Sequence, residues 1–99
     1  NAQGKYEAAS PLFQKSLEIK ERVLGEDHLE TAVSYNNLAL NLNSQGEYET
    51  AEPLYQKSLE IRERVLGTDH PDTAASYNNL ALNLDAQGEF SAAAPLYQR

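Results

Sequence analysis

The sequence has no cysteine, few basic residues and no long apolar run, and each absence excludes a class of protein. Without cysteine the chain can form no disulfide framework, thiol nucleophile or cysteine-based metal site. Eight Lys and Arg against fifteen Asp and Glu give a net charge of −7, which argues against nucleic acid and membrane as partners, because both bind basic surfaces. No run approaches the roughly 20 apolar residues of a membrane span, and the chain opens on no secretory signal. A cytoplasmic location fits these absences best.

What the sequence does contain is a period of 42 residues. Glycine recurs at that spacing at positions 4, 46 and 88, and proline at 11, 53 and 95. Residues 1–42 and 43–84 differ at ten positions and are identical at the other 32. A repeat of this length indicates a stacked array, in which each unit buries its apolar face against its neighbours. Because 40% of the residues are hydrophobic, one small folded domain is expected.

Each period predicts two helices. In the first, from Thr31 to Gln45, apolar and small residues recur at helical spacing and form one buried stripe: Thr31, Ala32, Tyr35, Leu38, Ala39 and Leu42. The second runs from about Tyr48 to Leu66. Gly46 and Gly67 follow these helices, and we expect both glycines to adopt the left-handed conformation that ends a helix. The predicted fold class is therefore all-α.

The linker between periods contains a helix-start signal. In Asp69-His70-Pro71-Asp72, Asp69 or His70 can cap, proline suits the first helical position, and the second aspartate meets the positive end of the helix dipole. The preceding copy has Leu29 in place of Pro71, so we expect a less sharply defined start there. An Asp-His pair could also suggest a metal ligand or a general base, but no third ligand or nucleophile is spaced to join it. Capping is the preferred interpretation.

Pro53 lies five or six residues into the second helix, beyond the turn in which a missing N–H costs nothing. We therefore expect that helix to begin late or to bend near the Glu49 carbonyl.

The units also predict how the chain is divided. We expect residues 1–25 to be the end of one repeat, mainly its second helix, residues 26–67 to be a full repeat, and residues 68–99 to be a truncated one. The 99 residues would then be a fragment of a longer array, with apolar surface exposed at both ends.

The segment from Tyr35 to Ile61, which returns as Tyr77 to Gln98, resembles a tetratricopeptide repeat. Six residues stand at motif positions: Leu38, Ala39, Gly46, Tyr48, Ala51 and Tyr55. The 42-residue period and the linker VLGTDHPDTA are similar to the kinesin light chain subtype. The resemblance implies a right-handed α-α superhelix, a solenoid of antiparallel helix pairs, whose concave face is lined by the first helix of each repeat and binds peptides or protein segments. No pattern of catalytic or ligating residues is present in the sequence, so neither an enzyme nor a cofactor is expected.

The face of the first helix opposite the buried stripe is the candidate peptide-binding site. It comprises Val33, Asn36, Asn37, Leu40, Asn43 and Ser44 in one copy, and Ala75, Asn78, Asn79, Leu82, Asp85 and Ala86 in the next. Asparagine is a poor helix former, about half a kcal/mol or more worse than alanine, so two in succession suggest a use for their amides. An amide offers both a donor and an acceptor to the backbone of an extended peptide.

Two alternatives stay open at this stage. Asn37 and Asn79 could instead bond to a neighbouring helix and serve packing between repeats, with Asn36 and Asn78 closer to the groove. Leu40 and Leu82 could be ordinary exposed leucines. At the level of function, the exposed ends could stack head to tail in a structural or self-assembling segment that has no peptide ligand.

Overall fold

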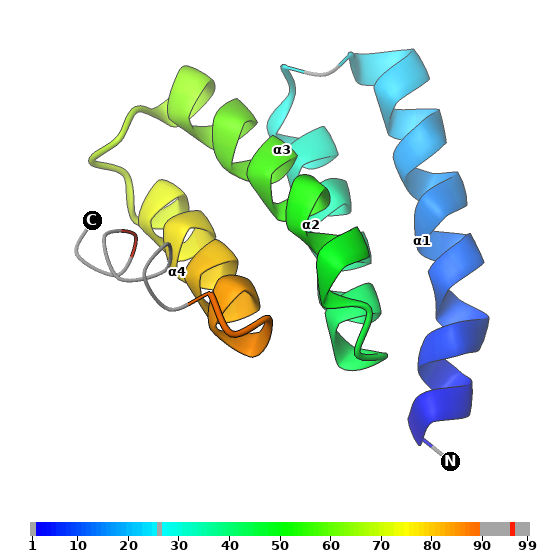
Figure 1. The fold of residues 1–99 in the computed structure, drawn as a ribbon. Coiled ribbons are helices and arrows are strands. Elements are labelled where there is room, and N and C mark those ends of the chain that lie inside the picture. Colours follow the sequence, from blue (N-terminus) through cyan, green and yellow to red (C-terminus); the bar gives the residue numbers. More distant parts are fainter. Residues whose placement is uncertain (1, 26, 90–95, 97–99) are drawn as a thin grey trace.

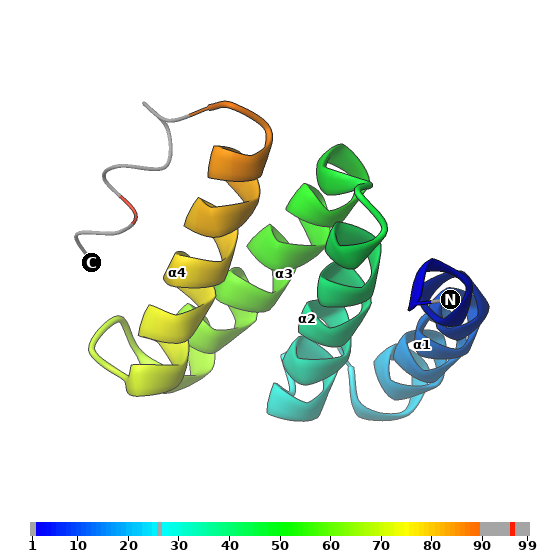
Figure 2. The same cartoon turned by 90° about the horizontal axis from the view of Figure 1, so that it is seen from below.

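The computed structural model describes residues 2–25, 27–89 and 96. Within them the chain forms four helices: α1 (Ala2–Leu24), α2 (Leu29–Ser44), α3 (Tyr48–Leu66) and α4 (Pro71–Ala86). Each helix runs antiparallel to the one before it and packs against it, with α1 and α4 at opposite ends of the row (Figures 1 and 2). The predicted all-α arrangement of helix pairs is confirmed. The second helix expected after Gly88 lies, apart from Leu96, outside the described residues.

The core is the line along which neighbouring helices meet. All six residues of the stripe predicted on α2 are buried. From α3 the core receives Ala51, Tyr55, Ser58, Leu59 and Ile61. From α4 it receives Leu80, Ala81 and Leu84, among others. Each helix between two others is therefore buried from both sides, which is how a stacked array obtains its stability.

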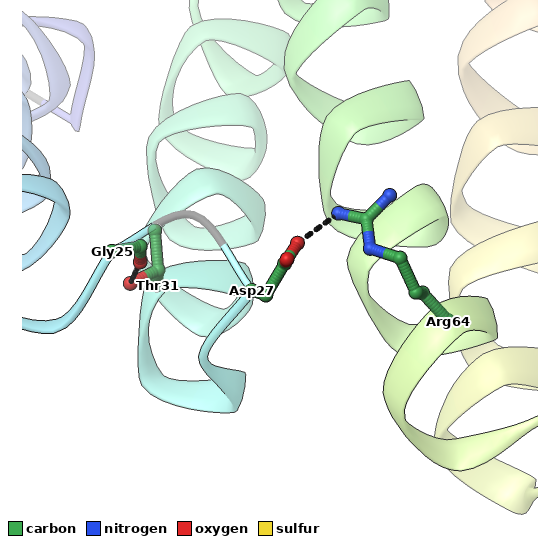
Figure 3. Close-up of polar contacts among 4 residues, drawn as sticks. All are labelled: Gly25, Asp27, Thr31 and Arg64. Atoms are coloured by element: carbon green, nitrogen blue, oxygen red, sulfur yellow. Dashed lines mark hydrogen bonds and ion pairs between the residues drawn. The ribbon is translucent and has the colours of Figure 1, made fainter.

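Polar contacts hold the linkers between helices in place, and Figure 3 shows those of the linker between α1 and α2. Thr31 Oγ1 donates to the Gly25 carbonyl, and its repeat counterpart Thr73 to the Gly67 carbonyl, both at 2.8 Å. Arg64 near the end of α3 forms an ion pair with Asp27 in the α1–α2 linker. Because both threonines are fully buried, these bonds hold the linker geometry the same in successive units.

The starts of α2 and α4 are the same. His28 and His70 are the N-cap residues, and Nδ1 of each accepts the backbone N–H two residues later, at 3.1 and 3.0 Å. Of the two predicted caps, His70 rather than Asp69 is the one used. The expectation of a less sharply defined start at Leu29 is wrong, because the imidazole cap fixes the first turn whether or not proline follows it.

The helix ends divide into two kinds. Gly46, with φ 83°, ends α2 as predicted: its N–H bonds to the Asn43 carbonyl at 3.0 Å and that of Glu47 to the Leu42 carbonyl at 2.9 Å, the two bonds of a Schellman motif. Gly67 differs from the expectation. Its φ of 88° and ψ of 167° lie outside the left-handed helical region and within a region open essentially to glycine alone. The chain therefore leaves α3 extended, into the linker.

Pro53 lies inside α3, which begins at Tyr48. The expected late start is wrong: Ala51 N–H already bonds to the Glu47 carbonyl at 3.1 Å. Proline removes one intrahelical bond, and the packing of α3 against both α2 and α4 holds the first turns in place. A bend near Glu49 stays a prediction.

Candidate binding face on α2 and α4

The residues predicted to bind a peptide lie along one side of α2 and α4, which we call the α2–α4 face. On α2, an exposed stripe at helical spacing contains Val33, Asn37, Leu40 and Ser44. On α4 the exposed members are Ala75, Asn78, Leu82 and Ala86. Four members of the face are half-buried: Asn36 and Asn43 on α2, and Asn79 and Asp85 on α4. The face is therefore mixed apolar and amide, and Asp85 is its one ionisable member.

Three branched apolar side chains stand out on this face. Val33 is 41% exposed, Leu40 44% and Leu82 52%. Single exposed apolar residues are common on protein surfaces, so their recurrence at one position matters more than the exposure of any one of them. Here the same position, Leu40 and its counterpart Leu82, is exposed in both copies.

The asparagines divide into a bonded pair and two exposed amides. Asn79 Nδ2 donates to Asn36 Oδ1 at 3.1 Å and so ties α4 to α2. Asn37 and Asn78 are exposed. One member of each predicted pair thus takes part in the contact between repeats. That bond uses Asn79 Nδ2 and Asn36 Oδ1, and within the described residues the remaining atoms, Asn36 Nδ2 and Asn79 Oδ1, have no hydrogen-bond partner.

A further asparagine, Asn83, was missed by sequence reasoning and is fully buried. Its Nδ2 donates to Asn43 Oδ1 at 3.0 Å and to the Tyr48 carbonyl at 2.9 Å. Its Oδ1 accepts from Gln87 Nε2 at 2.8 Å. Because every group of a buried amide needs a partner, Asn83 is a packing residue that fixes α4 on the α2–α3 turn. Its position beside the buried stripe, three residues after Leu80, was the available signal.

On the other side of α2 there is a groove of about 420 Å³ between α1 and α3. Its floor is apolar, with Leu38 and Leu42 of α2 between Leu17 and Leu54. Glu18 and Glu21 lie at its rim, and Glu21 already accepts from the Tyr35 hydroxyl at 2.7 Å. This groove follows from the packing of successive units.

The described residues contain no group of three or more His, Asp or Glu able to hold a metal ion. No helix in the described part of the chain is long and apolar enough to cross a membrane. Burial raises the pKa of Tyr55 to about 12, because a core position of 2% exposure disfavours the phenolate. Tyr55 lies in the core and not on the α2–α4 face.

The helix pairs are antiparallel and repeat in the same register, and the same linker and cap hydrogen bonds recur in successive units. These features define the chain as a helical repeat array. The tetratricopeptide repeat family matches over residues 1–63 and again over 35–99. The chain belongs to the tetratricopeptide repeat family. Proteins built from this repeat generally serve as scaffolds for protein–protein interaction.

Solved structures agree on the subtype. A kinesin light chain-like protein with nearly identical TPR-like repeats from Podosopora anserina is 26% identical, with a TM-score of 0.85 over 96% of this chain. BtubC (BKLC) from P. vanneervenii is also 26% identical, with a TM-score of 0.77 over 96% of this chain. The chain spans 45% of the first protein and 40% of the second, less than half of either. It matches no curated protein.

Proposed function

We propose that the α2–α4 face is the concave side of the array and binds an extended peptide or protein segment. The observation that carries the proposal is the alignment of Val33, Leu40 and Leu82, each more than 40% exposed, on a face with one ionisable residue in a chain of net charge −7. An apolar, weakly charged surface of this kind takes apolar side chains with little desolvation cost.

The asparagine pair supplies the polar part of the binding face. The bond from Asn79 to Asn36 holds both amides in one orientation before a ligand arrives, so little side-chain entropy remains to be lost. The Asn36 Nδ2 donor and the Asn79 Oδ1 acceptor then match the alternating C=O and N–H groups of a peptide backbone. Recognition of this type depends on backbone shape and on apolar side chains more than on charge.

The test is a selection of peptides from a displayed random library on the 99-residue chain, followed by anisotropy titration of the peptides obtained. The double variant Leu40→Ala, Leu82→Ala should weaken binding at least about tenfold, since each truncation removes apolar contact with the peptide worth about 1 kcal/mol. The matched control is Gln56→Ala with Glu60→Ala, two exposed positions on α3, which should bind like the parent. Equal affinities for the two double variants would contradict the proposal.

A further inference from the structure

The groove between α1 and α3 lies inside the row of helices and not at either end of it. α2 forms its floor, and α1 and α3 stand on either side of α2 (Figures 1 and 2). Every residue that lines the groove belongs to the described part of the chain. Its volume of about 420 Å³ is within the range of ligand pockets, about 300 to 1,000 Å³.

The apolar part of the groove consists of four leucines from three helices, which we call the floor leucines: Leu17, Leu38, Leu42 and Leu54. The first three are buried core residues, and Leu54 is half-buried and packs against that core. Because the core holds these side chains in place, the floor is formed before a ligand arrives, and little conformational entropy remains to be lost on binding. An apolar side chain that entered the groove would gain dispersion contacts that the floor lacks on its open side.

The α1 wall of the groove carries two carboxylates, Glu18 and Glu21, and no Lys or Arg lines the groove. Glu21 accepts from the Tyr35 hydroxyl, whereas Glu18 is exposed and has no hydrogen bond or ion pair within the described residues. Side chains three positions apart lie next to each other on a helix, so the two negative charges repel. A cation between them would replace this repulsion with attraction.

The same combination returns one repeat length later. Three buried leucines and two glutamates stand at the corresponding positions of the next unit: Leu59, Leu80, Leu84, Glu60 and Glu63. Glu63 accepts from the Tyr77 hydroxyl, as Glu21 does from the hydroxyl of Tyr35. The pairing of an apolar floor with a carboxylate wall is therefore built into the repeat unit.

We propose that the groove between α1 and α3 binds an extended protein segment that carries a leucine and, two positions later, an arginine. Alternate side chains of an extended segment point the same way, so both enter the groove. The leucine covers the floor leucines, and the guanidinium donates to the carboxylates of Glu18 and Glu21, which are the acceptors that suit its planar shape. The net charge of −7 attracts such a segment from a distance.

The first test is an NMR titration of the 99-residue chain with a capped peptide, Gly-Leu-Ser-Arg-Gly. The methyl signals of the floor leucines should shift. Two control peptides each lack one feature: Gly-Ser-Ser-Arg-Gly has no apolar side chain, and Gly-Leu-Ser-Glu-Gly reverses the charge. Each should bind at least about tenfold more weakly, through lost apolar burial in the first and repulsion from the α1 wall in the second. Equal affinities of the three peptides would overturn the proposal.

A matched pair of variants tests the charges of the α1 wall. Glu18→Gln keeps the size of the side chain and removes one carboxylate, so it should weaken binding of the Leu-Ser-Arg peptide several-fold. The loss should shrink in molar salt, where the charges are screened. Glu30→Gln removes the same charge at an exposed position in the first turn of α2, outside the groove, and should bind like the parent. Equal losses would mean that only net charge acts, which would overturn the site.

A second pair of variants tests the shape of the groove. Gln14 and Ser16 are both exposed on α1, but only Gln14 lines the groove. In Gln14→Phe the ring should fill the groove and lower affinity at least about tenfold, whereas Ser16→Phe should bind like the parent. Thr50→Phe fills the groove from the α3 wall and should act like Gln14→Phe, and circular dichroism checks that each variant is folded. Unchanged binding by the two filling variants would overturn the site.

The groove site is independent of the proposed function, because its residues lie on the other side of α2 from Leu40. The double variant Leu40→Ala, Leu82→Ala should therefore bind the Leu-Ser-Arg peptide like the parent. A loss of binding in that variant, with no shift of the floor leucines, would place the peptide on the α2–α4 face and overturn the groove site. Failure of the groove site leaves the library selection on the α2–α4 face unaffected.

Discussion

α1 and α3 place nearly the same sequence in two environments. Residues 6–24 and 48–66 are identical at fifteen of nineteen positions, yet Ile61 is fully buried and Ile19 is 43% exposed. The difference arises because, in the described part of the chain, α3 packs against both α2 and α4, whereas α1 packs mainly against α2. In an array of this kind, burial is therefore a property of the position in the stack more than of the residue.

The largest difference between the two helices is expected for the isoleucines. Ile61→Ala should lower the free energy of unfolding by about 3 kcal/mol, because it leaves a cavity between α2 and α3. At low protein concentration, Ile19→Ala should lower the free energy of unfolding by less than about 1 kcal/mol, because the Ile19 side chain keeps much of its contact with water in the folded chain. Urea unfolding of both variants measures the two values. Equal costs would show that α1 and α3 are packed alike.

The next difference concerns an ionisable group present in α3 and absent from α1. Tyr55 has Phe13 as its counterpart, and the pKa of Tyr55 is raised from 10.0 to about 12 by burial. Between pH 10 and 12 the unfolded chain loses this proton while the folded chain keeps it. The contribution of Tyr55 to the free energy of unfolding is therefore complete below pH 10 and is lost as the pH rises to 12. The loss is on the order of 2 kcal/mol.

The variant Tyr55→Phe, which copies α1, should therefore unfold like the parent at pH 8 and resist urea better at pH 11. Urea titrations of both proteins at the two pH values separate Tyr55 from the other tyrosines, which both proteins share. A parent and variant that lose stability in parallel up to pH 12 would refute this assignment.

A smaller effect is expected at the serines. Ser58→Ala removes the bond to the Ala32 carbonyl and should cost about 1 kcal/mol. Ser16→Ala should leave stability unchanged at low concentration, because Ser16 is exposed. Thermal unfolding by circular dichroism compares the two. A loss at Ser16 that matches the loss at Ser58 would mean that α1 is already covered.

The smallest effect is expected at the arginines. Arg64 and Asp27 are 54% and 70% exposed in their side chains, so Arg64→Ala should cost only a few tenths of a kcal/mol. The loss should disappear in molar salt, where the pair is screened. Arg22→Ala should cost nothing in either condition. Unfolding at low and high ionic strength distinguishes them, and a salt-independent loss at Arg64 would point to packing by its aliphatic part.

Most of the fold followed from periodicity. The stripe on α2 and the helix end at Gly46 depend on local spacing and on backbone sterics, which a single sequence contains. The conformation of Gly67 and the start of α3 before Pro53 depend on how neighbouring helices hold the linker and the first turns. Those are tertiary effects, which no pattern within one unit specifies.

The candidate site was predicted less completely. Spacing placed Leu40 and Leu82 on an exposed face, because the opposite face is plainly apolar. It could not separate Asn36 from Asn37, since adjacent residues lie 100° apart on a helix and either could turn toward the next repeat. It also passed over Asn83, because a buried amide is explained only by partners such as the Tyr48 carbonyl, which lie 35 residues away.

The bond between Asn79 and Asn36 has a consequence for how such a protein changes over time. The Asn-Asn pair stands at 36–37 and again at 78–79, so each copy contains a donor position for the copy before it and an acceptor position for the copy after it. Gain or loss of a whole 42-residue unit by unequal recombination would create no junction that the protein did not already have. Length can therefore vary by duplication without any compensating mutation, whereas a substitution at either asparagine weakens one junction and leaves the others intact.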